Sequence, residues 1–385
     1  MNIGTTSCER FKKSKKLEIV KNIKKELKRN YGIDLLRIFA MINIIILHIN
    51  LFCDQLSLDF RNPKFKVFWR LETMAYWAVD GFGMISGIVG YKHYKFSNLM
   101  IIWVQSSFYS FGISLYFHLF CHKMNQKKLY LSFLPLLSNI NWYVNAYFCM
   151  YLFLPFINYG IMNLDRNTYK GIILFFFLFC SLYHMITTIL VKQTNYHFLN
   201  SGYSALWLII LYIIGGYFGK YVLNHQTFSL KYCICFIFIY IGSSYFSFEF
   251  YFKSKINKEL FISYLSPTML MQTISLIMLF SKLNIKNKWI IKIISFFTPL
   301  TFNITLIHLR LLMEDNLMKR KLYKYVKNLK SDLLYFKIYG LGIVVYLFCG
   351  MIDFLRLLLF NLLRIKKICI FIENKFPLLI SKINI

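Results

Sequence analysis

Acidic residues, proline and paired cysteines are all scarce in this chain of 385 residues. Only 16 Asp and Glu stand against 46 Lys and Arg, which gives a formal charge of +30 at pH 7. With only six prolines, long stretches are free to form uninterrupted helix. The nine cysteines include no C-x-x-C pair and no cluster with histidine at metal-site spacing, which argues against a zinc site or a disulfide scaffold. We expect no metal ion and no bound cofactor.

Charged residues are also few, at 16%, whereas hydrophobic residues make up 57% and aromatic residues 19%. Several apolar runs reach about 20 residues, the length that spans the hydrocarbon core of a bilayer. The positive charge is concentrated in tails and short loops, where it fits contact with anionic lipid better than contact with nucleic acid. The sequence therefore predicts an all-α polytopic transmembrane protein whose partners include membrane lipids but not nucleic acid.

Ten spans are expected, and an even number places both termini on one side of the membrane. The tail before the first span carries ten Lys and Arg, which predicts cytoplasmic termini by the positive-inside rule. No small-residue cleavage site follows the first span, so we expect it to remain in the protein. The expected spans are 33–53, 74–91, 99–119, 142–160, 170–190, 204–222, 231–250, 262–281, 290–310 and 336–361. The expected parts are a basic cytoplasmic tail over 1–30, a membrane domain over 31–365 and a cytoplasmic C-terminal tail over 366–385.

The first apolar run, Ile33 to Asn50 (IDLLRIFAMINIIILHIN), contains ionisable residues. Such groups are costly in lipid, so they usually face a protein interior. Arg37 and His48 are eleven residues apart, which is three turns plus roughly 20°, so both leave the same helix face, about 16 Å apart along the axis. Asp34 precedes Arg37 by three residues and shares that face. We expect the rest of the protein to enclose this pair.

Depth in the membrane sorts the polar groups into two layers. His48 lies ~22 Å from the cytoplasmic face and Asp80 ~9 Å from the outer face, which is the same level of a ~30 Å core. The outer layer holds two histidines and two carboxylates, namely His48, His308, Asp80 and Glu249. The inner layer holds two arginines and two aspartates, namely Arg37, Arg356, Asp34 and Asp353. Arginine suits phosphate recognition, and histidine beside a carboxylate suits general base catalysis on a hydroxyl.

Each of these residues also has a structural interpretation that the sequence leaves open. Arg37 could be an anchor that reaches lipid headgroups, and His48 could be a hydrogen-bonded packing residue. Asp80 could satisfy the end of a neighbouring helix, and His308 could lie at a helix interface. Arg356 has an aspartate three residues before it, which is the spacing of a structural ion pair.

Several motifs follow the Arg37-to-His48 spacing along the chain. They are VDGFGMISG at 79–87, NWYVNAYFCMYLFLPFIN at 141–158, SGYSALWLIILYIIGGY at 201–217, LSPTMLMQ at 265–272 and TLIH at 305–308. In this order they resemble the acyltransferase 3 family of integral membrane acyltransferases, especially members that O-acetylate bacterial surface polysaccharides. The resemblance covers about residues 30 to 365. The sequence departs from the family pattern at Thr305, where Tyr is frequent, and at Ile88, where an aromatic residue is common.

The resemblance implies an enzyme that transfers acyl groups other than aminoacyl groups, in the plasma membrane (the bacterial inner membrane). It implies acetyl-CoA as the donor, bound from the cytoplasm, and a surface glycan or undecaprenyl-linked glycan as the acceptor on the far side. His48 is then the base or the acyl-relay group, oriented by Asp80. The predicted catalytic residues are His48, Arg37, Asp80 and His308. The predicted residues for CoA phosphates are Arg37 and Arg356, and those for the sugar are Trp142, Tyr143 and Glu249.

Two other classes of membrane protein are alternatives. A polysaccharide flippase or transporter would be expected to show two related halves with paired Gly or Pro breaks in its spans. A glycan polymerase would be expected to carry a larger outer loop rich in Arg. We find neither pattern in the sequence, and transfer of label from acetyl-CoA would distinguish the enzyme from both.

Overall fold

The computed structural model describes eleven stretches of the chain, namely 29–53, 55–57, 61–92, 94–121, 125–135, 141–191, 199–223, 229–253, 260–314, 316–330 and 333–380. Within these stretches the regular structure is entirely helical, which confirms the all-α prediction. Most of the expected N-terminal tail, 1–28, lies outside the described residues. The α-helices are α2 (Tyr31–Phe52), α3 (Pro63–Ala75), α4 (Ala78–Gly90), α5 (Phe96–Leu119), α6 (Gln126–Ser132), α7 (Trp142–Asn163), α8 (Arg166–Phe176), α9 (His184–Val191), α10 (Ala205–Tyr217), α11 (Leu230–Lys253), α12 (Pro267–Ser281), α13 (Lys288–Phe297), α14 (Thr301–Glu314), α15 (Asn316–Asn328), α16 (Leu334–Leu362) and α17 (Ile365–Ile380).

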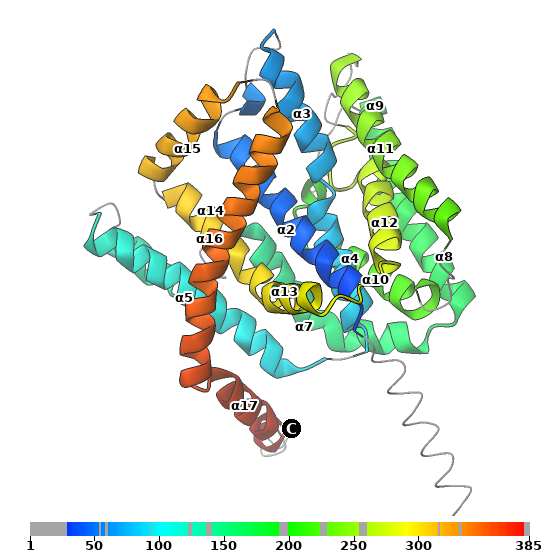
Figure 1. Ribbon diagram of the computed structural model, residues 1–385. Helices are drawn as coiled ribbons and strands as arrows, with labels where there is room; N and C mark the ends of the chain where they lie inside the picture. Colours follow the sequence, from blue (N-terminus) through cyan, green and yellow to red (C-terminus); the bar gives the residue numbers. More distant parts are fainter. Residues whose placement is uncertain are drawn as a thin grey trace, which may run out of the picture.

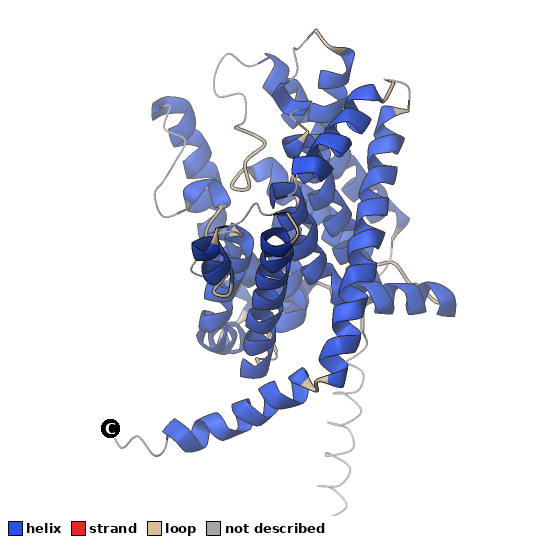
Figure 2. Ribbon diagram, turned by 90° about the vertical axis from the view of Figure 1, so that its left-hand side faces the viewer, coloured by secondary structure: helices blue, strands red, loops and turns tan. Residues whose placement is uncertain are grey.

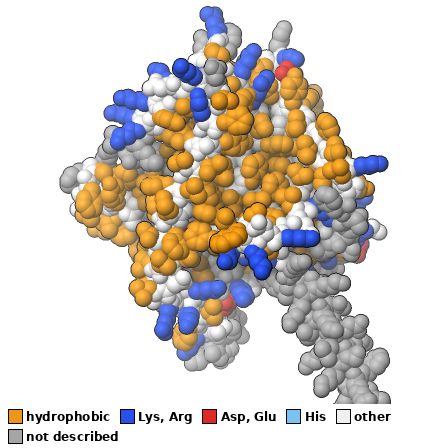
Figure 3. Space-filling model, in the orientation of Figure 1, with side chains coloured by type: hydrophobic (Ala, Val, Ile, Leu, Met, Phe, Trp, Pro, Cys, Tyr) orange, Lys and Arg blue, Asp and Glu red, His pale blue; other side chains and the backbone are white. Residues whose placement is uncertain are grey.

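Eight helical stretches among the described residues are long and apolar enough to cross a membrane. Figure 3 shows hydrophobic side chains over the middle of one face, with Lys and Arg gathered above and below them. An apolar band between two basic rims is the surface that a membrane-spanning bundle presents to lipid and its headgroups. The protein is therefore a multi-pass membrane protein. The eight stretches are 31–52, 96–119, 142–163, 166–190, 205–222, 230–253, 288–312 and 334–362.

The second and eighth expected spans are shorter than predicted. They correspond to α4, with 13 residues, and α12, with 15 residues. At 1.5 Å per residue these helices are about 20 and 22 Å long, less than the ~30 Å core. The segment 54–73, which the expected spans 33–53 and 74–91 leave as a loop, contains most of helix α3. Its start has a clear local cause: Pro63 occupies the first turn and the Asn62 side chain accepts a hydrogen bond from the Lys64 backbone N–H.

Helix α2 runs through the middle of the bundle (Figure 1) and packs against α3, α4, α12, α13, α14 and α16. It begins where the Asn30 side chain accepts hydrogen bonds from the backbone N–H groups of Gly32 and Ile33, at 3.0 and 3.2 Å. Side chains from several of its faces are fully buried, including Leu36 and Ile45. Because α2 is enclosed on most sides, its polar residues face protein or a cavity rather than lipid.

Helices α4 and α10 cross with their backbones in contact. A Cβ atom added to Gly87 would lie 2.0 Å from the Tyr212 carbonyl oxygen, and one added to Gly215 would lie 2.0 Å from that of Met84. A Cβ atom added to Gly83 would lie 2.9 Å from the Leu211 side chain. Gly83 and Gly87 are four residues apart on α4, a small-xxx-small spacing that lets two helices approach closely.

We expect Gly87→Ala to destabilise the protein by about 1–3 kcal/mol, because the new methyl group must push the two backbones apart. The measurement is the melting temperature and the yield of the detergent-solubilised protein. The control is Gly112→Ala in α5, where an added Cβ meets nothing within 4 Å. Equal melting temperatures for the two variants would contradict the close crossing.

Beyond α16 the chain bends and α17 runs away at a steep angle across one end of the bundle (Figure 2). The bend is at Arg364, whose φ of 52° is in the left-handed region. The Glu373 carboxylate on α17 accepts a hydrogen bond from the Phe96 backbone N–H, at 2.7 Å. Hydrogen bonds from Ser97 and Phe96 hold the pKa of Glu373 below its ordinary value. The segment predicted as a tail therefore contains a helix that caps the start of α5.

Candidate active site

A cavity of about 970 Å³ runs along one side of α2. The residues of α2 that line it form a stripe at helical spacing: Arg37, Met41, Ile44, Leu47, His48 and Leu51. Arg37 and His48 therefore open into one shared space, as their eleven-residue spacing predicts. We refer to the two ends of this space as the Arg37 end and the His48 end.

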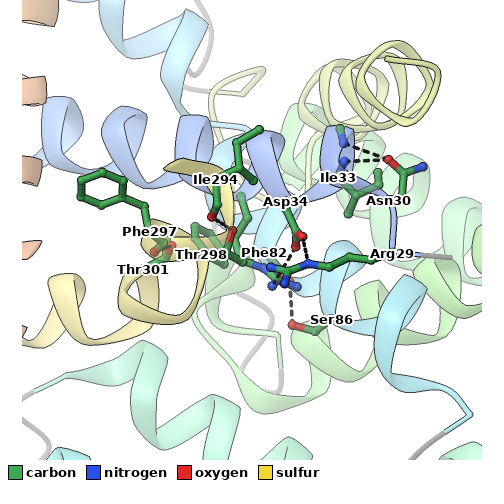
Figure 4. Close-up of polar contacts among 12 residues, drawn as sticks. Arg29, Asn30, Ile33, Asp34, Phe82, Ser86, Ile294, Phe297, Thr298 and Thr301 are labelled. Carbon is green, nitrogen blue, oxygen red and sulfur yellow. Dashed lines mark hydrogen bonds and ion pairs between the residues drawn. The ribbon is translucent and has the colours of Figure 1, made fainter. Parts of the chain in front are cut away.

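At the Arg37 end, one carboxylate lies between two guanidinium groups. Asp34 accepts a hydrogen bond from Arg29 Nε, and its other oxygen lies 3.7 Å from an Arg37 nitrogen. Figure 4 shows the Arg29 and Asp34 side chains in contact, with Ser86 and Phe82 close by. The Arg37 side chain contacts Asp34 on one side. The side chain is still 23% exposed and lines the cavity, so a ligand in the cavity can reach it. Two cations against one carboxylate leave this end with a net positive charge, which suits an anion.

At the His48 end, two imidazole rings are hydrogen-bonded to each other. His48 Nδ1 lies 2.8 Å from His308 Nε2, and His308 Nδ1 lies 2.7 Å from the carbonyl oxygen of Ile304. A carbonyl only accepts, so His308 carries a proton on Nδ1, and in the neutral ring its Nε2 is then unprotonated and accepts. His48 must then donate through Nδ1. In a neutral ring this leaves His48 Nε2 unprotonated, with a lone pair that can accept a proton. His48 lines the cavity whereas His308 is 1% exposed, so the free base belongs to His48.

Asp80 does not orient His48, contrary to the prediction. It is fully buried outside the cavity lining, and its Oδ1 accepts a hydrogen bond from Trp207 Nε1 at 3.0 Å. His48 Nδ1 is instead hydrogen-bonded to His308 Nε2. Asp80 thus connects α4 to α10, where the two helices already cross closely.

Arg356 is also absent from the cavity lining. Its Nε and one terminal nitrogen donate to the two oxygens of Asp353, at 2.8 and 2.9 Å, and both side chains are at most 4% exposed. The Tyr109 hydroxyl donates to the same carboxylate at 2.7 Å. The ion pair expected from the i,i+3 spacing is therefore present, and the structure does not bring Arg356 to the predicted phosphate site.

Glu249 lies outside the cavity lining as well, so the structure does not bring it to the sugar site predicted for it. It forms an i,i+4 ion pair with Lys253, at 2.8 Å, on the partly exposed face of α11. Among the described residues, no group of three or more His, Cys, Asp or Glu side chains is placed to hold a metal ion.

Trp142 and Tyr143 begin α7 and both line the cavity. Trp142 belongs to a cluster of aromatic rings that the sequence analysis did not assemble. Its ring centroid lies 4.6 Å from that of Tyr203, which lies 4.9 Å from that of Tyr264. Tyr76 stacks on Tyr264 at 4.5 Å, and its hydroxyl lies 3.1 Å from that of Tyr203. We call Tyr76, Trp142, Tyr203 and Tyr264 the ring cluster; all four line the cavity.

Glu72 is a further lining residue that sequence reasoning missed. It lies on α3, in the segment that was predicted to be a loop. The Asn62–Pro63 start signal, followed by an apolar stripe that includes Phe65, Phe68 and Trp69, is the pattern that could have identified this helix.

Of three comparisons with known proteins, the one with family models gave a match. Searches of curated proteins and of solved structures gave no match. The family model described as an acyltransferase domain, that of the acyltransferase 3 family, matches residues 30–352. This range contains both ends of the cavity and most of the chain. The protein therefore belongs to the acyltransferase 3 family and is a membrane acyltransferase.

Proposed function

We propose that this acyltransferase moves an acetyl group from cytoplasmic acetyl-CoA to a hydroxyl of a cell-surface polysaccharide or of its undecaprenyl-linked precursor. The observation that carries the proposal is the hydrogen-bond chain from His48 through His308 to the Ile304 carbonyl, because it leaves His48 Nε2 available as a base in the cavity that Arg37 also lines. An anion-binding group and a base at opposite ends of one space are what a reaction between a phosphate-bearing thioester and an alcohol requires.

The Arg37 end is proposed to hold the phosphates of the donor. Guanidinium groups bind phosphate through charge and a fork of donors, and Asp34 holds the Arg37 side chain from behind. Along α2, about 16 Å separates Arg37 from His48. A donor with phosphates at one end and a thioester on a long arm can therefore reach the base without leaving its phosphate site.

At the His48 end, His48 Nε2 takes the proton of the acceptor hydroxyl while the hydroxyl oxygen attacks the thioester carbonyl. The new C–O bond forms, the C–S bond breaks, and the proton passes from His48 to the CoA sulfur as it leaves. His308 accepts the hydrogen bond from His48 Nδ1 throughout, which fixes the ring and stabilises the imidazolium that forms.

The direct test is transfer of label from acetyl-CoA to glycan in membranes that contain the protein, with membranes lacking it as the control. NMR of the surface polysaccharide from the same two strains reports the O-acetyl content. We expect label transfer and O-acetyl signals only where the protein is present. Equal O-acetyl content in both strains would reject the proposed acceptor.

We expect His308→Ala to lower the transfer rate at least about tenfold, because His48 Nδ1 loses its acceptor and the ring loses its orientation. His308→Gln retains an oxygen that can accept from His48 Nδ1, so it should recover part of the rate. Initial rates at saturating acetyl-CoA measure both variants. Equal rates for Ala and Gln would show that His308 only fills space.

A further inference from the structure

The cavity has a second charged group, at the end opposite Arg37. Glu72 is the carboxylate among the described lining residues, and it is 7% exposed. Asn50 Nδ2 donates to Glu72 Oε2 at 3.0 Å, and Asn50 is itself fully buried. A buried amide that holds one oxygen fixes the orientation of this side chain, as expected for a group that belongs to a binding site.

The Asn50 contact places Glu72 near the level of His48. Asn50 follows His48 by two residues on α2, about 3 Å along the helix axis, whereas it lies about 20 Å beyond Arg37. The cavity therefore has a guanidinium at one end and a carboxyl group at the other. A donor carrying phosphates is attracted to the Arg37 end, so the positive charge there sets its binding direction.

The ring cluster adjoins Glu72. Tyr76 follows Glu72 by four residues on the chain, which in α3 and the turn after it is one helical turn away. Aromatic faces carry negative charge, and the C–H groups on one face of a sugar ring are weakly positive, so the two stack favourably. An aromatic surface with a few fixed polar groups is the usual composition of a small-molecule site.

We infer that Glu72 is an acceptor-binding residue: its carboxylate accepts a hydrogen bond from a sugar hydroxyl while the sugar ring lies against the ring cluster. This inference rests on the proposed acetyl transfer to a glycan. A carboxylate only accepts hydrogen bonds and a sugar presents many hydroxyl donors, so the pair is complementary and charge-assisted. Another hydroxyl of the bound glycan is then free to reach His48 Nε2 in the same cavity.

The test is Glu72→Gln, assayed for label transfer from acetyl-CoA to endogenous glycan in membranes and for O-acetyl content of the polysaccharide by NMR. Glutamine keeps an oxygen for the Asn50 amide, so the contact between α2 and α3 survives while the charge is lost. We expect transfer to fall by about 10- to 100-fold, the effect of losing a hydrogen bond to a charged group. The matched control is Glu249→Gln, a carboxylate outside the cavity lining, which should retain the wild-type rate.

A second readout separates acceptor binding from a structural role. In Glu72→Gln the acetyl-CoA concentration for half-maximal transfer should stay within about twofold of wild type, because the Arg37 end is untouched. The inference is overturned if Glu72→Gln transfers as fast as Glu249→Gln, or if its half-maximal acetyl-CoA concentration rises in step with the loss of rate. If wild-type membranes transfer no acetyl group to glycan, the proposed function fails, which is a separate result.

Discussion

Replacing His48 with alanine is expected to lower acetyl transfer by about 10²- to 10⁴-fold, the contribution of a well-placed general base. His48 Nε2 is the unprotonated nitrogen in the cavity, because Nδ1 is used in the bond to His308. Alanine removes the base but retains a good helix former within α2. The measurement is label transfer from acetyl-CoA in membranes, normalised to the amount of protein in the membrane.

The control for this variant is His118→Ala. His118 lies in the last turn of α5 and does not line the cavity, so its loss should leave transfer unchanged. A His48→Ala protein that acetylates glycan at the wild-type rate would reject His48 as the base and the proposed function with it. Loss of protein from the membrane in His48→Ala alone would instead indicate that the residue serves packing.

Replacing Arg37 with alanine is expected to lower transfer about 100-fold at limiting acetyl-CoA, because two charge-assisted hydrogen bonds to phosphate are lost together. The substitution also leaves Asp34 beside the site with Arg29 as its remaining guanidinium partner in the described structure. Arg37→Lys keeps the charge but loses the fork of donors, so it should fall between wild type and alanine. Initial rates over a range of acetyl-CoA concentrations measure the effect.

Arg166→Ala is the matched control for the loss of an arginine. Arg166 is exposed at the start of α8 and absent from the cavity lining, so its variant should keep the wild-type dependence on acetyl-CoA. If Arg37→Ala shows the same dependence as Arg166→Ala, the donor phosphates bind elsewhere, and the proposed orientation of the donor is incorrect.

The fold class and the central pair could be predicted from the sequence because both depend on local rules. Apolar length predicts spans, and the helical repeat alone places Arg37 and His48 on one face of α2. The i,i+3 spacing likewise predicts the ion pair that Arg356 forms with Asp353. Such inferences need no knowledge of which helices are neighbours.

Depth arguments succeeded less often because depth fixes a level and not a direction. His308 and Asp80 were both assigned to the level of His48, but only His308 points toward it. Asp80 points instead to Trp207 on α10, because α4 and α10 pack together although they are far apart in the sequence. Glu72 was missed for another reason: its segment was treated as a loop, so it was never given a depth.

The hydrogen bond between the His48 and His308 imidazoles limits how many protons the pair can take up. His48 Nδ1 lies 2.8 Å from His308 Nε2, and His308 Nδ1 is hydrogen-bonded to the Ile304 carbonyl. A second added proton would therefore place two N–H groups and two positive charges next to each other, which is unfavourable. The two rings can therefore hold one added proton between them, and in the proposed reaction that proton must pass to the departing thiolate before another alcohol can be deprotonated. If the donor is acetyl-CoA, as proposed, protonation of the leaving thiol and regeneration of the base are the same proton transfer.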